Sequence, residues 1–254
     1  MNKPLIISVE NLIKKYDDFE AVKGISFEVH EGEIFGLLGP NGAGKTTTLE
    51  IMETLRDKTS GKISIGGYDL DQSPNEIKHI IGVQLQAAGY YPNLNLIELI
   101  DLFSGLYGIK VNALELLRKV SLTEKAKAKY KELSGGQKQR FSIATTLINQ
   151  PKIIFLDEPT TGLDPQARRN LWDLILEIRA TGTTIVLTTH YMDEAEVLCD
   201  RVAFIDNGQI IGINSPDQFV DDLVASGFER KKEVKKANLE DVFISLTGKD
   251  LRES

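Results

Sequence analysis

The sequence contains little cysteine, little histidine and no long uninterrupted hydrophobic run. Cys199 is its single cysteine, so no internal disulfide can form, as is typical of cytosolic proteins. The longest apolar stretch, Leu94 to Ile109, is interrupted by polar residues and falls short of the roughly 20 residues that span a membrane. The N-terminus lacks the apolar core of a signal peptide. We therefore expect a cytoplasmic protein that reaches any membrane through a partner.

Basic residues are fewer than acidic residues. Lysine and arginine number 30 against 37 acidic residues, which gives a formal net charge of −7. Because binding to nucleic acid favours a basic surface, this balance argues against DNA or RNA as the main partner. The 41% hydrophobic and 26% charged content is ordinary for a globular protein, and 254 residues can form one α/β domain with a subdomain.

One stretch fits the phosphate-binding pattern G-x-x-x-x-G-K-[ST], known as Walker A. Glycines let a loop bring its backbone N–H groups against phosphate oxygens, the lysine adds a positive charge, and the Thr46 hydroxyl can ligate Mg²⁺. An apolar strand precedes this stretch and a helix is predicted from Thr47 to Leu55, so the loop lies at a helix N-terminus. The expected phosphate-binding residues are Gly39, Pro40, Asn41, Gly42, Ala43, Gly44, Lys45, Thr46 and Thr47.

Hydrophobic periodicity predicts an α/β protein. Strands are expected at 5–9, 21–29, 33–38, 62–65, 152–156 and 184–187, with a hairpin formed by 202–205 and 210–213 around Asn207-Gly208. Asn95 and Glu98 have capping-box spacing, which predicts a helix to about Tyr107; Ser121 and Glu124 have the same spacing. Further helices are expected at 166–179, from Pro216, and around 239–246, before Gly248. Residues 94–149 therefore form a mostly helical insertion.

Two adjacent carboxylates follow the strand at 152–156. Asp157 can hold Mg²⁺, and Glu158 points the other way along the strand, where it can act as a general base for water. Such a pair can also simply cap a turn or helix. Downstream of a Walker A loop, the catalytic interpretation is favoured.

A second anion site is predicted at Ser134, Gly135, Gly136 and Gln137, where a helix begins. The string Leu133-Ser-Gly-Gly-Gln137 is the signature motif of the ATP-binding cassette (ABC) ATPases, and the chain resembles that family from about residue 5 to 215. The resemblance implies a P-loop NTPase core with an antiparallel β subdomain and an inserted helical subdomain. It also implies ATP and Mg²⁺ as ligands, and two cassettes whose Walker A and signature loops face each other head to tail.

The resemblance assigns further residues. Tyr16 resembles the aromatic that stacks on adenine, although a strand tyrosine is often packing, and His190 resembles the switch histidine near the γ-phosphate. Gln86 resembles the glutamine that senses Mg²⁺ and the membrane partner, and it is assigned catalytic and metal roles. Gln84 competes for this assignment, and Leu85 stands where the family usually has proline. Leu163 and Asp164 resemble the D-loop at the dimer interface.

The strings around Thr160–Pro165 and Thr189–Glu196 look most like stand-alone ATPase subunits of bacterial drug-resistance exporters. This implies a separate polytopic membrane subunit, a second cassette of the same or a different chain, and a place at the cytoplasmic face of the membrane. Tyr90 and Tyr91 are expected to contact that subunit. We expect an ATPase domain at 1–215 and a helical extension at 216–254. The alternatives are a cassette acting on a non-membrane partner and a nucleotide-gated module without hydrolysis.

Overall fold

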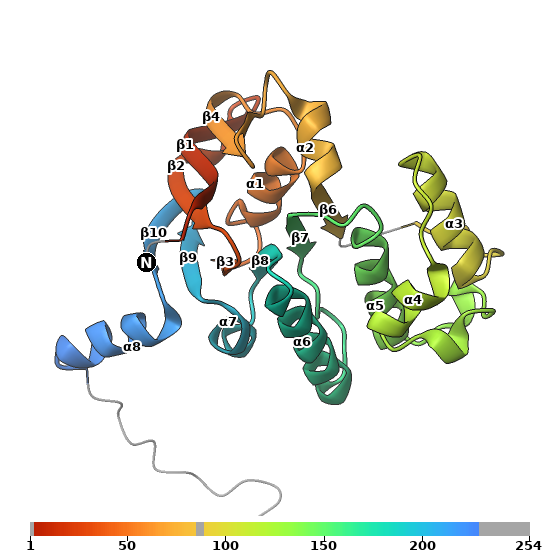
Figure 1. Ribbon diagram of the computed structural model, residues 1–254. Coiled ribbons are helices and arrows are strands. Elements are labelled where there is room, and N and C mark those ends of the chain that lie inside the picture. Colours follow the sequence, from red (N-terminus) through yellow and green to blue (C-terminus); the bar gives the residue numbers. More distant parts are fainter. Residues whose placement is uncertain (1–2, 85–88, 229–254) are drawn as a thin grey trace, which may run out of the picture. The chain divides into compact units, whose positions relative to one another are not determined.

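The computed structural model describes residues 3–84 and 89–228 (Figure 1). The chain divides into two compact units, Met1–Phe219 and Val220–Ser254. In the second unit, the described residues continue helix α8 (Pro216–Ala225). The expected helix at 239–246 lies outside the described residues. None of the described helices is both long and apolar enough to cross a bilayer.

A six-stranded sheet forms the centre of the first unit, in the order β10-β9-β3-β8-β7-β6 (Figure 1). Its strands pair in parallel except for the β9–β10 hairpin, which turns at Asn207-Gly208 as the sequence predicts. Every residue of β3, β7 and β8 is buried, which explains their continuous apolar runs. The strands are β3 (Ile34–Leu38), β6 (Ile81–Gln84), β7 (Ile153–Asp157), β8 (Thr184–Thr189), β9 (Arg201–Asp206) and β10 (Gln209–Asn214).

A second, four-stranded sheet has the order β2-β1-β4-β5 and is antiparallel throughout. Its strands are β1 (Leu5–Tyr16), β2 (Phe19–His30), β4 (Ser60–Ile65) and β5 (Tyr68–Asp69), followed by the short helix α2 (Pro74–Ile80). Helix α1 (Lys45–Met52) contributes Leu49, Ile51 and Met52 to an apolar cluster that also contains residues of both sheets. This shared core fixes the position of the loop that enters α1.

The inserted region contains helices α3 (Leu96–Leu106), α4 (Ala113–Lys119) and α5 (Gly135–Thr146), as expected for 94–149. The Asn95–Glu98 capping box is confirmed: the Glu98 N–H donates to Asn95 Oδ1 at 3.0 Å. The capping box predicted at Ser121 is wrong. Ser121 adopts a φ of 56°, and the element after it is a three-residue 3-10 helix, Thr123–Lys125, without a side-chain cap. A second 3-10 turn, Tyr130–Glu132, precedes α5.

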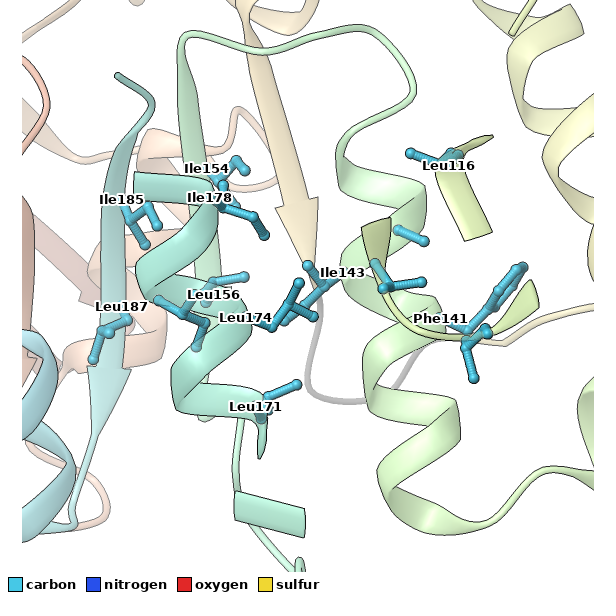
Figure 2. Packing of buried hydrophobic residues seen from close by; sticks show 14 of the residues in the cluster. Leu116, Phe141, Ile143, Ile154, Leu156, Leu171, Leu174, Ile178, Ile185 and Leu187 are labelled. Atoms are coloured by element: carbon cyan, nitrogen blue, oxygen red, sulfur yellow. The ribbon is translucent and has the colours of Figure 1, made fainter. Parts of the chain in front are cut away.

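Helix α6 (Pro165–Ala180) covers the parallel sheet with one apolar face (Figure 2). Leu174 and Ile178 belong to the same buried cluster as Ile154 of β7 and Ile185 of β8. The cluster continues into the helical insertion through Phe141 of α5, so the sheet and the insertion share one hydrophobic core. Helix α7 (Met192–Leu198) follows β8 and contributes Ala195 and Leu198 to this core.

Candidate functional site

The loop from Gly39 to Gly44 connects the buried strand β3 to helix α1 and has no room for side chains at two points. A Cβ at Gly39 would lie 2.0 Å from the Ile205 carbonyl oxygen. Gly44 has a φ of 101°, and a Cβ there would lie 2.6 Å from the Ala21 carbonyl oxygen. Both positions therefore require glycine, which explains the spacing of the motif.

Lys45 begins α1 and folds back over this loop. Its Nζ donates to the carbonyl oxygens of Gly39 at 2.8 Å and Pro40 at 3.0 Å, and lies 3.9 Å from Glu158 Oε1. The side chain is buried, and this desolvation lowers the pKa of the ammonium group, with Glu158 and Asp157 opposing the shift. A phosphate group here would give the cation a partner of opposite charge.

Asp157 lies at the end of β7 beside Thr46. The Thr46 hydroxyl donates to Asp157 Oδ1 at 3.1 Å, and the Thr188 hydroxyl donates to the same oxygen. Burial raises the pKa of the Asp157 carboxyl, although both hydrogen bonds oppose this effect. The sequence interpretation missed Thr188. Its signal was its position two residues before His190, because alternate residues of an extended segment point to the same side.

Glu158 has a φ of 46° and its N–H donates to the Thr188 carbonyl and hydroxyl oxygens at 3.2 and 3.0 Å. Left-handed backbone at a non-glycine residue is unfavourable and typical of functional sites. The carboxylate is held at both oxygens: Oε1 lies 3.1 Å from His190 Nδ1, and Oε2 accepts from the Thr161 hydroxyl at 3.0 Å. The structure thus brings the predicted pair Glu158 and His190 together. Thr161 was not predicted as a site residue.

These groups share a cavity of about 630 Å³. Tyr16 lies on its wall, as predicted, and Phe19 of β2 adds an exposed aromatic ring that the sequence interpretation did not single out. The Tyr16 ring also lies 5.0 Å from Lys14 Nζ and 5.4 Å from the Arg56 guanidinium carbon. The cavity is lined by Tyr16, Phe19, Ala21, Asn41, Gly42, Gly44, Lys45, Thr46, Thr47, Glu158, Thr161 and His190.

The signature residues lie in a different pocket, of about 330 Å³, which shares no lining residue with the first. Ser134 caps α5 in a reciprocal capping box: the Gln137 N–H donates to Ser134 Oγ at 3.3 Å, and the Ser134 N–H donates to Gln137 Oε1 at 3.0 Å. Gly135, Gly136 and Arg140 line the same pocket, together with Leu163 and Asp164. Within one chain the two predicted anion sites are therefore separate.

The D-loop-like segment leads directly into α6. Asp164 is the N-cap of this helix, because its Oδ1 accepts from the Ala167 N–H at 2.9 Å. Gly162 has a φ of 76° and turns the chain toward the cap. Asp164 thus has a structural role in its own chain, beside the predicted role at a dimer interface.

Gln86 lies outside the described residues, whereas its competitor Gln84 ends β6 and is buried. The prediction that Tyr90 contacts a membrane subunit stays a prediction, and in this chain the side chain is partly buried. Its hydroxyl lies within hydrogen-bonding distance of Ser142 and Thr145 of α5, and its ring packs against Tyr130 and Phe141. Tyr91 next to it is 63% exposed and stays available for a partner.

Comparisons with known proteins identify the family of this chain. The family model described as "ABC transporter" matches residues 22–161. The chain is 41% identical over 215 residues to the linearmycin resistance ATP-binding protein LnrL of Bacillus subtilis (strain 168), covering 83% of this chain and 69% of that protein. It is 35% identical to the Nod factor export ATP-binding protein I of Burkholderia orbicola (strain AU 1054), covering 97% of this chain and 98% of that protein.

Solved structures give the same result. An ATP-binding subunit of an ABC transporter superposes with a TM-score of 0.76 at 29% identity, covering 95% of this chain and 99% of that one. A dimeric bacterial ABC transporter cassette superposes with a TM-score of 0.75 at 28% identity, covering 83% and 99%. The fold, the loop geometry and these relatives lead to one conclusion: this chain belongs to the ABC transporter family, as one of its ATP-binding cassettes.

Proposed function

We propose that this cassette hydrolyses Mg²⁺-bound ATP in a pair of cassettes and thereby drives export through a separate membrane subunit. The observation that carries the catalytic part is the position of Glu158. Its carboxylate lies beside the phosphate-binding lysine and is held by His190 and Thr161. A carboxylate fixed in this way is suited to orient and deprotonate a water molecule near the phosphate of a bound nucleotide.

The residues at the end of β7 fit a magnesium ion. Thr46 Oγ1 and Asp157 Oδ1 are 3.1 Å apart and supply the hydroxyl and carboxylate oxygens that Mg²⁺ prefers. Among the described residues, no group of three or more acidic, histidine or cysteine side chains could hold a metal alone. Mg²⁺ characteristically shares few protein ligands with substrate phosphates, so Thr46 and Asp157, with Gln86 as predicted, would hold it. When bound, the ion would neutralise phosphate charge.

The remaining roles in binding and catalysis fall to different residues of the chain. Lys45 and the N–H groups of the loop 39–47 bind phosphate, and Tyr16 packs against the base. His190 holds the Glu158 carboxylate through Nδ1, and Thr161 holds its other oxygen, so the general base keeps one orientation. Positioned groups of this kind lower the barrier because orientation is established before the reaction.

A second cassette completes the site. The signature residues Ser134 to Gln137 line a pocket separate from that of Lys45, so a phosphate held by Lys45 would meet a signature loop only from another subunit. Leu163 and Asp164 lie in the signature pocket and would belong to the same interface. The dimeric ABC cassette structure among the relatives supports this arrangement.

We infer the direction of transport and the membrane partner from similar proteins. One similar protein is a linearmycin resistance ATP-binding protein and another is a Nod factor export ATP-binding protein. We therefore favour export, through a polytopic membrane subunit that recruits this cassette to the cytoplasmic face of the membrane. Tyr91 is the exposed candidate for that contact. Residues 1–215 would form the ATPase domain, with the helical subdomain at 94–149, and residues 216–254 an extension.

The test is Glu158→Gln, which keeps the shape of the side chain but replaces one carboxylate oxygen with an amide nitrogen and so removes the base. We expect ATP affinity within about twofold of wild type and turnover reduced by about 10³-fold, with a nucleotide-bound dimer accumulating. Glu196→Gln, the same change at an exposed position of α7, is the matched control and should leave turnover unchanged. Unchanged turnover in Glu158→Gln would disprove the assigned role. Co-purification with a membrane protein from solubilised membranes tests the partner.

A further inference from the structure

Helices α6 and α7 are joined next to His190 by side chains that the catalytic scheme does not use. Helix α6 follows the D-loop-like segment directly, because Asp164 caps it. Helix α7 follows His190 directly, with Tyr191 as its N-cap residue. A link between these helices therefore connects the segment expected at the dimer interface to the histidine that holds Glu158.

Arg168 of α6 is the first part of this link. Its guanidinium carbon lies 5.5 Å from the ring centre of Trp172 and 5.5 Å from that of Tyr191, and its Nη1 lies 3.4 Å from Asp193 Oδ2. A planar cation placed between two aromatic rings and a carboxylate has little freedom to move. The Tyr191 ring in turn lies 4.1 Å from the His190 ring, centre to centre.

Glu194 of α7 is the second part. It is fully buried, and its Oε1 accepts from the Trp172 indole N–H at 3.2 Å. Burial raises the pKa of this carboxyl, and the hydroxyls of Thr189 and Thr160, with the indole, oppose the rise. A buried carboxyl group is costly, so its retention between α6, Thr189 and Thr160 calls for a role beyond packing.

We propose that Arg168, Trp172 and Glu194 are positioning residues that transmit the placement of α6, and thus of the D-loop-like segment, to His190 and Glu158. Arg168 acts through the Tyr191 ring on the His190 ring. Glu194 acts on the two chain segments that carry the pair, since Thr189 precedes His190 and Thr160 lies two residues after Glu158. The inference rests on the proposed function, because it concerns how the general base of that reaction is oriented.

The kinetic test uses two conservative changes in the full-length protein. Arg168→Lys keeps the charge opposite Asp193 but loses the planar group between the rings, and Trp172→Phe keeps a ring but loses the N–H donor to Glu194. A misplaced catalytic pair should lower kcat by about tenfold in each variant, with the KM for ATP within about twofold of wild type. Arg169→Lys is the matched control, since Arg169 is exposed on the same helix, and it should behave as wild type.

A spectroscopic test uses Trp172, the single tryptophan of the chain. In Glu158→Gln, saturation with ATP and Mg²⁺ should change the tryptophan emission, and Arg168→Lys added to that variant should remove at least about half of the change, because the stacked cation no longer couples the helices. This readout needs binding but no hydrolysis, so it remains decisive if Glu158 proves not to be the base.

Two kinetic results would overturn the inference. One is a kcat within twofold of wild type in both conservative variants, and the other is a loss of kcat matched by equal losses of ATP affinity and thermal stability. Tryptophan emission unaffected by nucleotide would overturn it as well.

Discussion

The loops entering α1 and α5 both place a helix N-terminus at a pocket, but the side chains around them differ. The α1 pocket brings together a buried lysine, a hydroxyl beside Asp157, and a carboxylate paired with a histidine. The α5 pocket is lined by glycines, by polar or charged side chains that include Arg140 and the α6 cap Asp164, and by Leu163 and Ala167, and it has neither a lysine nor a histidine. This difference supports our proposal that α1 carries the chemistry, whereas α5 would contribute backbone and polar groups to a phosphate held by another cassette.

The largest expected effect on ATP affinity distinguishes the α1 pocket from the α5 pocket. Lys45→Ala should weaken ATP binding by about 100-fold, because a charge-assisted contact to phosphate is worth about 3 kcal/mol. The fold should persist, since burial lowers the pKa of Lys45 and its charge is therefore held at a cost. Calorimetric titration with ATP measures the affinity. Binding within threefold of wild type would contradict the assignment of Lys45 to phosphate.

Gly135→Asp tests the α5 pocket. A Cβ at Gly135 meets only Leu163 Cδ2, at 3.9 Å, so the first side-chain carbon is accommodated, and the negative charge of aspartate would repel phosphate. We expect nucleotide binding to the isolated chain to stay within about twofold of wild type, while turnover falls by about 100-fold. Gly135→Ala adds the Cβ without the charge and should retain most of the activity. Equal loss of binding in Gly135→Asp would show that the two pockets are not separate.

Folding stability should depend on pH through a buried carboxyl group next to α1. Glu53 ends α1 and is only 2% exposed, and burial raises its pKa from 4.5 to about 8, with Asp157 and Glu50 adding to the rise. Since the folded pKa exceeds the unfolded one, the unfolded chain loses this proton first, and folding stability falls as pH rises from about 4.5 to 8. Glu53→Gln should therefore exceed wild type in unfolding free energy by on the order of 2 kcal/mol at about pH 8, and by much less at about pH 5.

Urea unfolding at the two pH values measures the Glu53 effect. Glu76→Gln on the exposed surface of α2 is the control and should give no pH-dependent gain. A Glu53→Gln variant equally stable relative to wild type at both pH values would mean that Glu53 is ionised in the folded protein.

The smallest effect concerns backbone strain after helices α1 and α4. Thr54, just beyond α1, has a φ of 61°, and Ser121, beyond α4, has a φ of 56°. Left-handed backbone is least tolerated by β-branched residues, so Thr54→Gly should stabilise the protein by about 1 kcal/mol and Ser121→Gly by less. Thermal unfolding of the two variants compares them. Destabilisation by Thr54→Gly would indicate that the threonine side chain makes a compensating contact.

The sequence predicted much of this site because its main residues lie in short motifs next to strongly patterned strands. Glu158 follows β7 and His190 follows β8, and neighbouring parallel strands bring their carboxyl ends together. Thr161 and Thr188 were not predicted as site residues because hydroxyl side chains are common. The carboxylates that they contact cannot be read from the sequence alone, since tertiary packing brings these groups together. The packing of Tyr90 was not predicted, for a related reason. Proline and glycine nearby suggested an exposed loop, whereas Tyr130 and Phe141, distant in sequence, pack against its ring.

The capping box predicted at Ser121 is wrong because of the local backbone conformation. Spacing alone gave the pattern, but the left-handed φ of Ser121 turns its side chain away from a helix start, and Leu122 is buried instead. Asn95, with the same spacing, has extended backbone and forms both hydrogen bonds. The backbone conformation of the first residue, which spacing does not encode, decides between the two.

The central claim is that the α1 pocket of one cassette works with the α5 pocket of another. Mixing Lys45→Ala, which should bind ATP weakly, with Gly135→Asp, which should turn ATP over slowly, tests it most directly in the reassembled protein. If two copies of this chain pair head to tail at random, about half of the dimers contain one copy of each variant. Each mixed dimer then has one intact site out of two, so about a quarter of wild-type turnover should return. Turnover that stays at the level of the separate variants would contradict a site shared between two copies of this chain.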